Sequence, residues 1–171
     1  MIELETAFSV IAILISFWSV YYTKRFWLES NRPIVSAVIE LQIRGIGLAS
    51  WNLVIYNSGN RPATNIRLEA KKEDIDAIIS TGADESHKVA IYKIFSPDTY
   101  IALLLESKSA KTAFFSFSNE AGSPEDIVKY EGKLPIRIKY SDIEKRQYVS
   151  SITLYIRDND GFGGGVWQSA K

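Results

Sequence analysis

The sequence predicts a mainly β protein: an immunoglobulin-like antiparallel β-sandwich preceded by one N-terminal transmembrane helix. Two observations carry this prediction. Residues 7–23 contain no charged side chain, and from Pro33 onward apolar and polar residues alternate in short runs separated by turn residues. The chain has 171 residues, enough for one domain with appendages, and its 46% hydrophobic content excludes a chain that is disordered throughout.

The predicted transmembrane helix covers residues 7–23 and follows a short tail, residues 1–6. At a rise of about 1.5 Å per residue it is near the lower limit of a span, about 17 residues. A buried core helix and a cleaved signal peptide are the alternatives. The segment is apolar on all sides, whereas a core helix needs an enclosing fold. The acidic N-terminus and the bulky aromatic residues after the span disfavour a signal peptide.

Aromatic and basic residues predict where the C-terminal end of this helix meets the lipid headgroups. Amphipathic rings gather at membrane interfaces, and long basic side chains reach the headgroups. The predicted interface residues are Trp18, Tyr21, Tyr22, Lys24, Arg25 and Trp27. Residues 24–32 should continue the helix as a juxtamembrane extension. The residue before Pro33 is biased away from helical geometry, so the helix should stop near Asn31 or Arg32. Basic residues follow the span and none precedes it, which predicts an N-terminus outside and a β domain facing the cytoplasm.

Residues 33–157 are predicted to form the β-sandwich. Apolar residues occupy alternate positions in residues 34–44, and further strands are expected at 51–56 and 64–70. Weaker strands are predicted at residues 77–80, 87–95, 100–105 and 111–118, and clear strands at 135–141 and 148–156. Residues 71–76 are expected to be a loop or a short helical turn, and residues 119–128 a loop with a short helix near Ser123. Residues 158–171, which are rich in glycine, are predicted to be a flexible tail.

The segment from Asn57 to Ala63 has the composition of a tight turn. Asparagine can hydrogen-bond its own backbone, and glycine tolerates positive φ. The residues assigned to this turn are Asn57, Gly59, Asn60, Pro62 and Ala63. We expect the turn to be a hairpin that fixes the register of two core strands. The alternative is a loop that presents a partner-binding site.

The order of these features resembles a widespread group of bacterial single-pass membrane-anchored proteins of unknown function. The resemblance is carried by the span, by Arg32-Pro33, by the Asn-x-Gly-x-x-Pro-Ala pattern of residues 57–63, and by the strand pair 135–141 and 148–156. It covers the span and part of the β domain. The resemblance implies a bacterial cytoplasmic (inner) membrane protein with an immunoglobulin-like β domain, and it supplies no catalytic residues.

The composition excludes several kinds of chemistry. The chain has no cysteine and one histidine, so it can build neither a thiolate nor a multi-histidine metal site. Lysine and arginine balance aspartate and glutamate, which disfavours a nucleic-acid partner. His87 lies near Ser86 and Asp84, but a surface histidine is favoured over a general base.

For the other candidate sites, a structural role is favoured over ligand binding. The acidic residues between 73 and 85 favour a solvated loop over a cation site, and Asp158–Gly161 favours a turn over a calcium loop, because no distal glutamate follows. The glycines of the tail lack the lysine and hydroxyl residue of a phosphate-binding loop. No cofactor, metal or small-molecule substrate is predicted.

The favoured function is a membrane-tethered, non-enzymatic adaptor that binds the lipid bilayer and a protein partner, or associates with itself. Edge strands of a sandwich offer backbone pairing, and small residues at 9, 12, 16 and 19 offer a helix-packing face in the span. Trp27 and Trp51 could anchor a partner, although an interfacial Trp27 and a core Trp51 are the simpler assignments. One alternative is an accessory or effector subunit of a multi-protein membrane system for defence or stress. Another is a hydrolase with an unrecognised carboxylate site.

Overall fold

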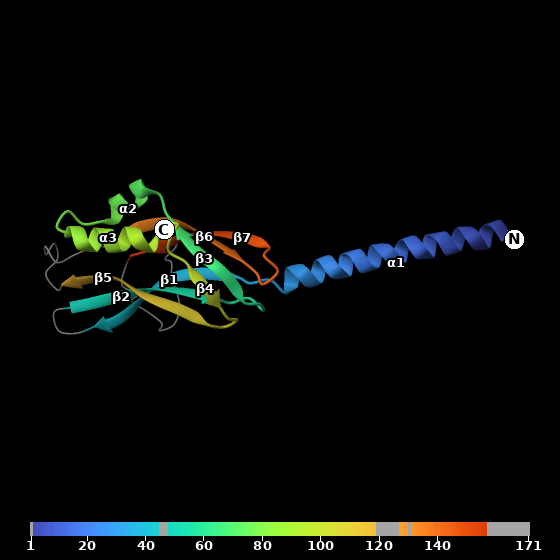
Figure 1. Ribbon diagram of the computed structural model, residues 1–171, viewed down its shortest axis with the longest axis horizontal. Helices are drawn as coiled ribbons and strands as arrows, with labels where there is room; N and C mark the ends of the chain where they lie inside the picture. Colours follow the sequence, from blue (N-terminus) through green and yellow to red (C-terminus); the bar gives the residue numbers. More distant parts are fainter. Residues whose placement is uncertain (1, 45–47, 119–126, 130, 157–171) are drawn as a thin grey trace. The chain divides into compact units, whose positions relative to one another are not determined.

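The computed structural model describes residues 2–44, 48–118, 127–129 and 131–156, and the chain divides into two compact units (Figure 1). The first unit is Met1–Arg32 and the second is Pro33–Lys171, here called the β domain. Residues 119–126 of the loop expected at residues 119–128, and the Gly-rich tail of residues 158–171, lie outside the described residues.

The first unit is one continuous helix, α1 (Ile2–Ser30). Its side chains are exposed from Thr6 to Trp27, and its 25-residue segment Thr6–Ser30 is long and apolar enough to cross a membrane. The predicted span and its juxtamembrane extension therefore form a single helix. At its C-terminal end the Asn31 side chain donates to the Trp27 carbonyl at 2.9 Å, and Pro33 is the third residue after the end of the helix.

The β domain contains two antiparallel sheets, as the alternating sequence pattern predicts. Sheet A has the order β1-β2-β5, and sheet B has the order β4-β3-β6-β7. The strands of sheet A are β1 (Val35–Arg44), β2 (Leu48–Asn57) and β5 (Ser109–Ser118). The strands of sheet B are β3 (Ala63–Glu69), β4 (Ile101–Leu104), β6 (Lys133–Ser141) and β7 (Gln147–Tyr155). The prediction of a mainly β protein with an N-terminal apolar helix is confirmed at this level.

The core of the β domain lies between the sheets. Every second residue of β6 is buried, from Leu134 to Tyr140, which is the period of a strand with one face on the core. Leu53 from sheet A is fully buried. Trp51 stacks on Phe115 with ring centroids 5.0 Å apart, so its prediction as a core residue is confirmed.

The connection from Asn57 to Ala63 is not a hairpin, and that prediction is wrong. β2 lies in sheet A and β3 lies in sheet B, so this segment carries the chain from one sheet to the other. Turn residues specify a local reversal of the backbone, but they do not specify which strand comes to lie beside β2. In the structure β1 and β5 occupy both sides of β2, which leaves β3 to pair with β4 and β6.

Two helices replace two predicted strands between β3 and β4. They are α2 (Lys72–Ile78) and α3 (Glu85–Ile94), so the strands expected at residues 77–80 and 87–95 are wrong. Asp84 caps α3 by accepting a hydrogen bond from the His87 backbone N–H at 2.9 Å. Ile91 and Phe95, one helical turn apart, are both buried, and Phe95 packs edge-on against Phe114 of β5. The helices therefore contribute to the hydrophobic core of the β domain.

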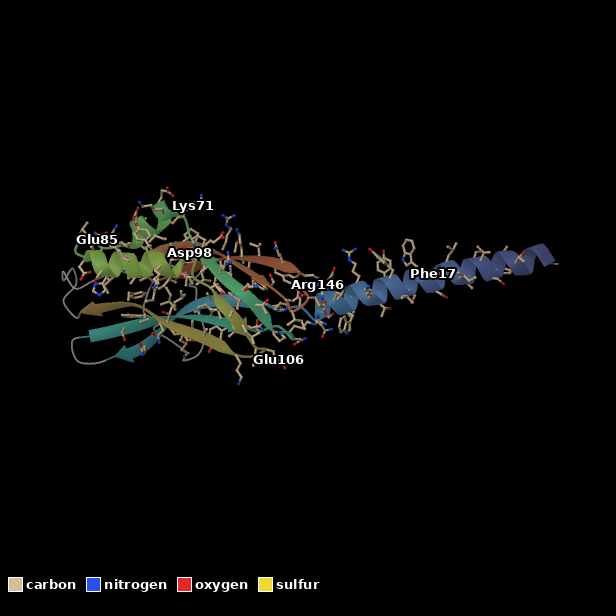
Figure 2. The ribbon with its side chains drawn as sticks, in the orientation of Figure 1. Phe17, Lys71, Glu85, Asp98, Glu106 and Arg146 are labelled. Carbon is tan, nitrogen blue, oxygen red and sulfur yellow. The ribbon has the colours of Figure 1, made fainter. Side chains whose placement is uncertain are left out.

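The two ends of the β domain hold different segments of the chain. We call the proximal end the one at which the chain enters from Pro33; it holds Ile34, the Asn57–Ala63 segment, and the connections at residues 105–108 and 142–146. We call the distal end the one that holds α2 and α3. Figure 2 shows Glu106 and Arg146 at the proximal end and Glu85 at the distal end.

Candidate interaction site

The buried amide of Asn57 holds three segments of the proximal end together. Its side chain donates to the carbonyls of Arg61 at 2.7 Å and Leu104 at 3.2 Å, and its Oδ1 accepts from the N–H groups of Ile34 at 3.3 Å and Gly59 at 3.1 Å. These are four hydrogen bonds from one amide that is 1% exposed. Because they join β1, β2 and the end of β4, this asparagine organises the proximal end as a whole.

A second buried polar residue, Asp142, shapes the connection between β6 and β7. Its Oδ1 accepts from the backbone N–H groups of Glu144 and Arg146, both at 2.9 Å. Its Oδ2 pairs with Arg146 Nε at 2.8 Å and accepts from Tyr148 Oη at 3.2 Å. The side chain is 1% exposed, and the burial of a carboxylate requires this degree of pairing. The start of β7 is therefore held in place by hydrogen bonds.

β7 is an end strand of sheet B, and its backbone pattern shows which groups face the open edge. Asp142 N donates to Arg146 O at 3.0 Å, Ile156 N donates to Gly132 O at 2.9 Å, and the ladder between these two bonds has no register shift. Antiparallel pairs alternate between bonded and non-bonded, so the even-numbered residues of β7 bond to β6. The odd-numbered residues from 147 to 155 therefore direct their N–H and C=O groups away from β6.

The edge of β7 lacks the features that protect other sheet edges. β4 has only four residues, β1 has a register shift between Leu41 and Ile43, and β5 carries Lys111, which pairs with Glu40 at 3.3 Å. Short length, bulges and charges each discourage pairing with another chain. β7 has nine residues, QYVSSITLY, without a charge, a proline or a bulge. Within the described residues it pairs only with β6, although β1 of the facing sheet runs alongside it.

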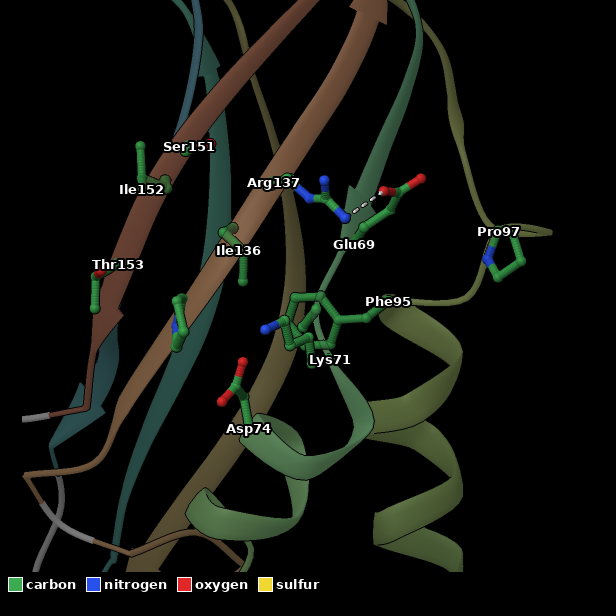
Figure 3. Close-up of a pocket in the computed structure, with 12 residues that line it drawn as sticks. Glu69, Lys71, Asp74, Phe95, Pro97, Ile136, Arg137, Ser151, Ile152 and Thr153 are labelled. Carbon is green, nitrogen blue, oxygen red and sulfur yellow. Dashed lines mark ion pairs between the residues drawn. The ribbon is translucent and has the colours of Figure 1, made fainter.

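A groove of about 790 Å³ opens on the outer face of sheet B beside this strand (Figure 3). Ile136 and Phe95 contribute buried apolar surface, and Ser151 and Thr153 line it from β7. Its charged residues are Glu69, Lys71, Asp74 and Arg137. Glu69 pairs with Lys139 at 2.8 Å and with Arg137 at 4.0 Å, so its charge is compensated. The groove offers an apolar floor and both signs of charge, which suits a peptide side chain.

Several titratable groups on or next to the helices have hydrogen-bond or ion-pair partners. The Asp84 carboxylate accepts from the His87 N–H and from Ser86 Oγ, and these bonds lower the pKa of Asp84. The Tyr92 hydroxyl donates to Asp76, which raises the pKa of Tyr92 to about 12. His87 is exposed on α3, and its Nδ1 lies 3.2 Å from Asp84. In the described part of the chain, no group of three His, Cys, Asp or Glu side chains is placed to hold a metal ion.

Comparison of the sequence with known protein families gives a match that covers most of the chain. The model of a family described as a domain of unknown function, DUF8453, matches residues 2–159. The chain belongs to the DUF8453 family. The match includes α1 together with β1 to β7, so the apolar helix is part of the DUF8453 sequence and not an addition peculiar to this chain. No curated protein and no solved structure matches the chain.

In this DUF8453 protein the predicted interface residues all lie on α1, with exposed side chains. Trp18 stacks on Tyr22 with centroids 5.5 Å apart, and Arg25 pairs with Glu29 at 3.1 Å. The residues of the predicted turn differ from one another in their exposure to solvent. Asn57 and Gly59 are joined by a hydrogen bond and Ala63 is buried, whereas Asn60 is exposed and Pro62 is half-buried.

The sequence did not reveal the β7 edge or the groove as candidate sites. The absence of charge in residues 147–155 is visible in the sequence, but it marks an interaction site only once β7 is known to end a sheet. The groove combines residues from β3, β6, β7, α2 and the segment that follows α3, and no local pattern links them. The tight hydrogen bonding of Asp142 had a partial signal, since an aspartate between two alternating strands is common in turns.

Proposed function

We propose that this DUF8453 protein is a membrane-tethered, non-enzymatic interaction module that pairs a strand of a protein partner with the edge of β7. The observation that carries the proposal is the nine-residue, uncharged, bulge-free edge described above. Addition of a partner strand to such an edge is a common mode of recognition, in which main-chain hydrogen bonds supply affinity and side-chain pockets supply selectivity. The adjacent groove would receive side chains of the partner.

The membrane tether is supported by the length and composition of α1. The 25 residues from Thr6 to Ser30 extend about 37 Å at 1.5 Å per residue, against a hydrocarbon core of about 30 Å. Lys24, Arg25 and Arg32 follow the apolar stretch, and no basic residue precedes it. By the positive-inside rule this favours a β domain in the cytoplasm and, with the sequence resemblance, a bacterial inner membrane.

The finer assignment of the β domain is an immunoglobulin-like sandwich. Seven strands in sheets of three and four, with connections that cross between the sheets at β2–β3, β4–β5 and β5–β6, support it. In this arrangement β4 pairs with β3, whereas in the constant-type immunoglobulin domain the corresponding strand lies in the other sheet.

A different protein is favoured over a second copy as the occupant of the edge. Antiparallel pairing of two β7 strands would put the proximal ends of the two copies at opposite ends of the strand pair. Both chains continue from that end into α1, so two copies in one membrane could pair in this way only with their strands parallel to the bilayer. A strand from another protein has no such restriction.

The test uses a proline at the open edge. Ser151 is an odd-numbered residue, so Ser151→Pro removes an edge N–H without removing a bond to β6. Ser151→Ala keeps that N–H and is the matched control. Crosslinking in native membranes should recover one reproducible partner with wild type and with Ser151→Ala, and lose it with Ser151→Pro. Equal recovery with both variants, each shown to be folded by circular dichroism, would refute pairing at β7.

Orientation is tested separately, and the lack of cysteine makes this simple. Val89→Cys on α3 introduces a single thiol at a side chain that is 57% exposed. A membrane-impermeant maleimide should label it only after spheroplasts are lysed. Labelling of intact spheroplasts would place the β domain outside the cytoplasm.

A further inference from the structure

Large apolar side chains are unevenly distributed over the surface of the β domain. Among its described residues the exposed ones are Ile34, Val89, Tyr100, Leu103, Leu105, Ile143 and Val149. Four of these, Ile34, Leu103, Leu105 and Ile143, lie at the proximal end, and only Val89 lies on the helices of the distal end. We call these four residues the proximal apolar cluster. A concentration of exposed apolar side chains at one end of a domain marks a surface that is covered by something.

Hydrogen bonds bring the members of this cluster to one end of the sandwich. Leu103 stands opposite Thr64 in the β4–β3 ladder, and the Thr64 hydroxyl donates to the carbonyls of Ser141 at 3.2 Å and Asp142 at 3.3 Å. Ile143 is the next residue, at the tip of the β6–β7 connection, and is 60% exposed. Because Asp142 is held by its own hydrogen bonds, the tip has a fixed shape and does not bury Ile143 by folding back.

The length of chain between α1 and the β domain restricts what can cover this cluster. Four residues lead from Ser30, the last residue of α1, to Ile34, and four residues reach at most about 14 Å. The headgroup layer of a bilayer is itself about 5–8 Å thick on each side. If α1 spans the membrane, this short connection keeps the proximal end near the headgroup layer, and the distal end can lie farther from it.

We infer that the proximal apolar cluster is a second membrane contact, in which Ile143, Leu103 and Leu105 enter the interfacial region of the bilayer that α1 spans. The inference rests on the proposed membrane tether and adds a contact by the β domain itself. The contact is apolar in character, because the connections at this end carry nearly balanced charge. The basic residues in these connections are Arg61, Lys108, Lys145 and Arg146, and the acidic ones are Glu106, Asp142 and Glu144; Arg61 pairs with Glu144 at 2.8 Å. Binding should therefore not depend on anionic lipid.

The experiment measures the depth of spin labels on the full chain in lipid nanodiscs. Three single-cysteine variants are used: Ile143→Cys in the cluster, Val89→Cys at the distal end and Phe17→Cys within α1. Val89 is 57% exposed and Ile143 is 60% exposed, so the first two are matched in the folded protein. Oxygen partitions into lipid and a chelated nickel complex stays in water, so the ratio of collision rates with these two quenchers reports depth.

The expected result is lipid-like accessibility at residues 17 and 143 and aqueous accessibility at residue 89, both in zwitterionic nanodiscs and in nanodiscs with anionic lipid. Aqueous accessibility at residue 143 together with lipid-like accessibility at residue 17 would overturn the second contact and leave the tether intact. Aqueous accessibility at residue 17 would overturn the tether itself. Penetration of residue 143 only with anionic lipid would overturn the apolar basis of the contact.

Discussion

Replacement of Asn57 by alanine should strongly destabilise the β domain. The substitution removes the four hydrogen bonds to Ile34, Gly59, Arg61 and Leu104. Each such bond contributes about 0.5–1.5 kcal/mol net, which gives a range of roughly 2–6 kcal/mol. We expect about 3–4 kcal/mol, because water will reach some of the freed groups. With a total stability of about 5–15 kcal/mol for a domain, this is a large fraction.

Thermal and urea unfolding of the full chain in detergent micelles, followed by circular dichroism in the β band, measures this loss. A loss of 3–4 kcal/mol corresponds to a fall in Tm of about 10–20 °C for a domain of this size. Ser58→Ala is the matched control in the same turn, because it removes only an exposed contact at 3.4 Å and should change stability by less than about 0.5 kcal/mol.

Asn57→Asp tests the donor atom of the Asn57 amide separately from its acceptor atom. Aspartate keeps the oxygen that accepts from Ile34 and Gly59, but the ionised carboxylate cannot donate to the carbonyls of Arg61 and Leu104. It should be at least as destabilising as alanine at pH 7, because it buries a charge beside two carbonyl oxygens. If Asn57→Ala were no more destabilising than Ser58→Ala, the role assigned to the amide would be wrong.

Three further predictions concern the packing and the helices. Gly132→Ala should cost about 1–3 kcal/mol in thermal unfolding, because the new Cβ would lie 3.0 Å from the Lys129 carbonyl oxygen and 3.2 Å from side-chain atoms of α2 and residue 156; an unchanged Tm would contradict this. The hydrogen bond to Asp76 raises the pKa of Tyr92 to about 12, so ultraviolet titration should show one tyrosine that ionises late, and this step should disappear in Asp76→Ala. The contribution of this hydrogen bond to stability is complete below the unfolded pKa of about 10 and is lost as the pH rises through about 12. Asp84→Ala should speed amide hydrogen exchange in the first turn of α3. Capping lowers the pKa of Asp84 below its ordinary 3.8. The protection in the wild-type protein should therefore be complete above pH 3.8 and be lost as the pH falls through the lowered pKa.

The sequence was sufficient for the elements whose pattern is local. The uncharged stretch before Thr23 predicts α1, and strict alternation predicts β6 and β7, because one face of each strand is buried and the other is wet. α3 was misassigned because its β-branched and aromatic residues have strand propensity. The competing helical signals in the sequence were two apolar residues four positions apart, Ile91 and Phe95, and an N-capping residue, Asp84. Both apolar residues are buried, and Asp84 caps α3.

The candidate site depends on relations that no local pattern records. Strand partners are chosen by the packing of the whole domain, so neither the sheet change after Asn57 nor the end position of β7 could be deduced from turn residues. The same holds for the proximal apolar cluster, whose members come from β4 and from three separate connections. A single exposed isoleucine or leucine is ordinary on a protein surface, and it indicates a contact surface only when other exposed apolar side chains lie near it.

The direction of β1 has a mechanical consequence. The chain enters β1 at the proximal end, and β7 runs from that end toward the distal end. Tension between the bilayer and a protein held along β7 would therefore act parallel to the strands. Nine residue pairs join β1 to β2, and a load in this direction strains all of them together instead of opening them one by one from an end. The β domain should thus behave as a stiff link that bears tension without yielding strand by strand.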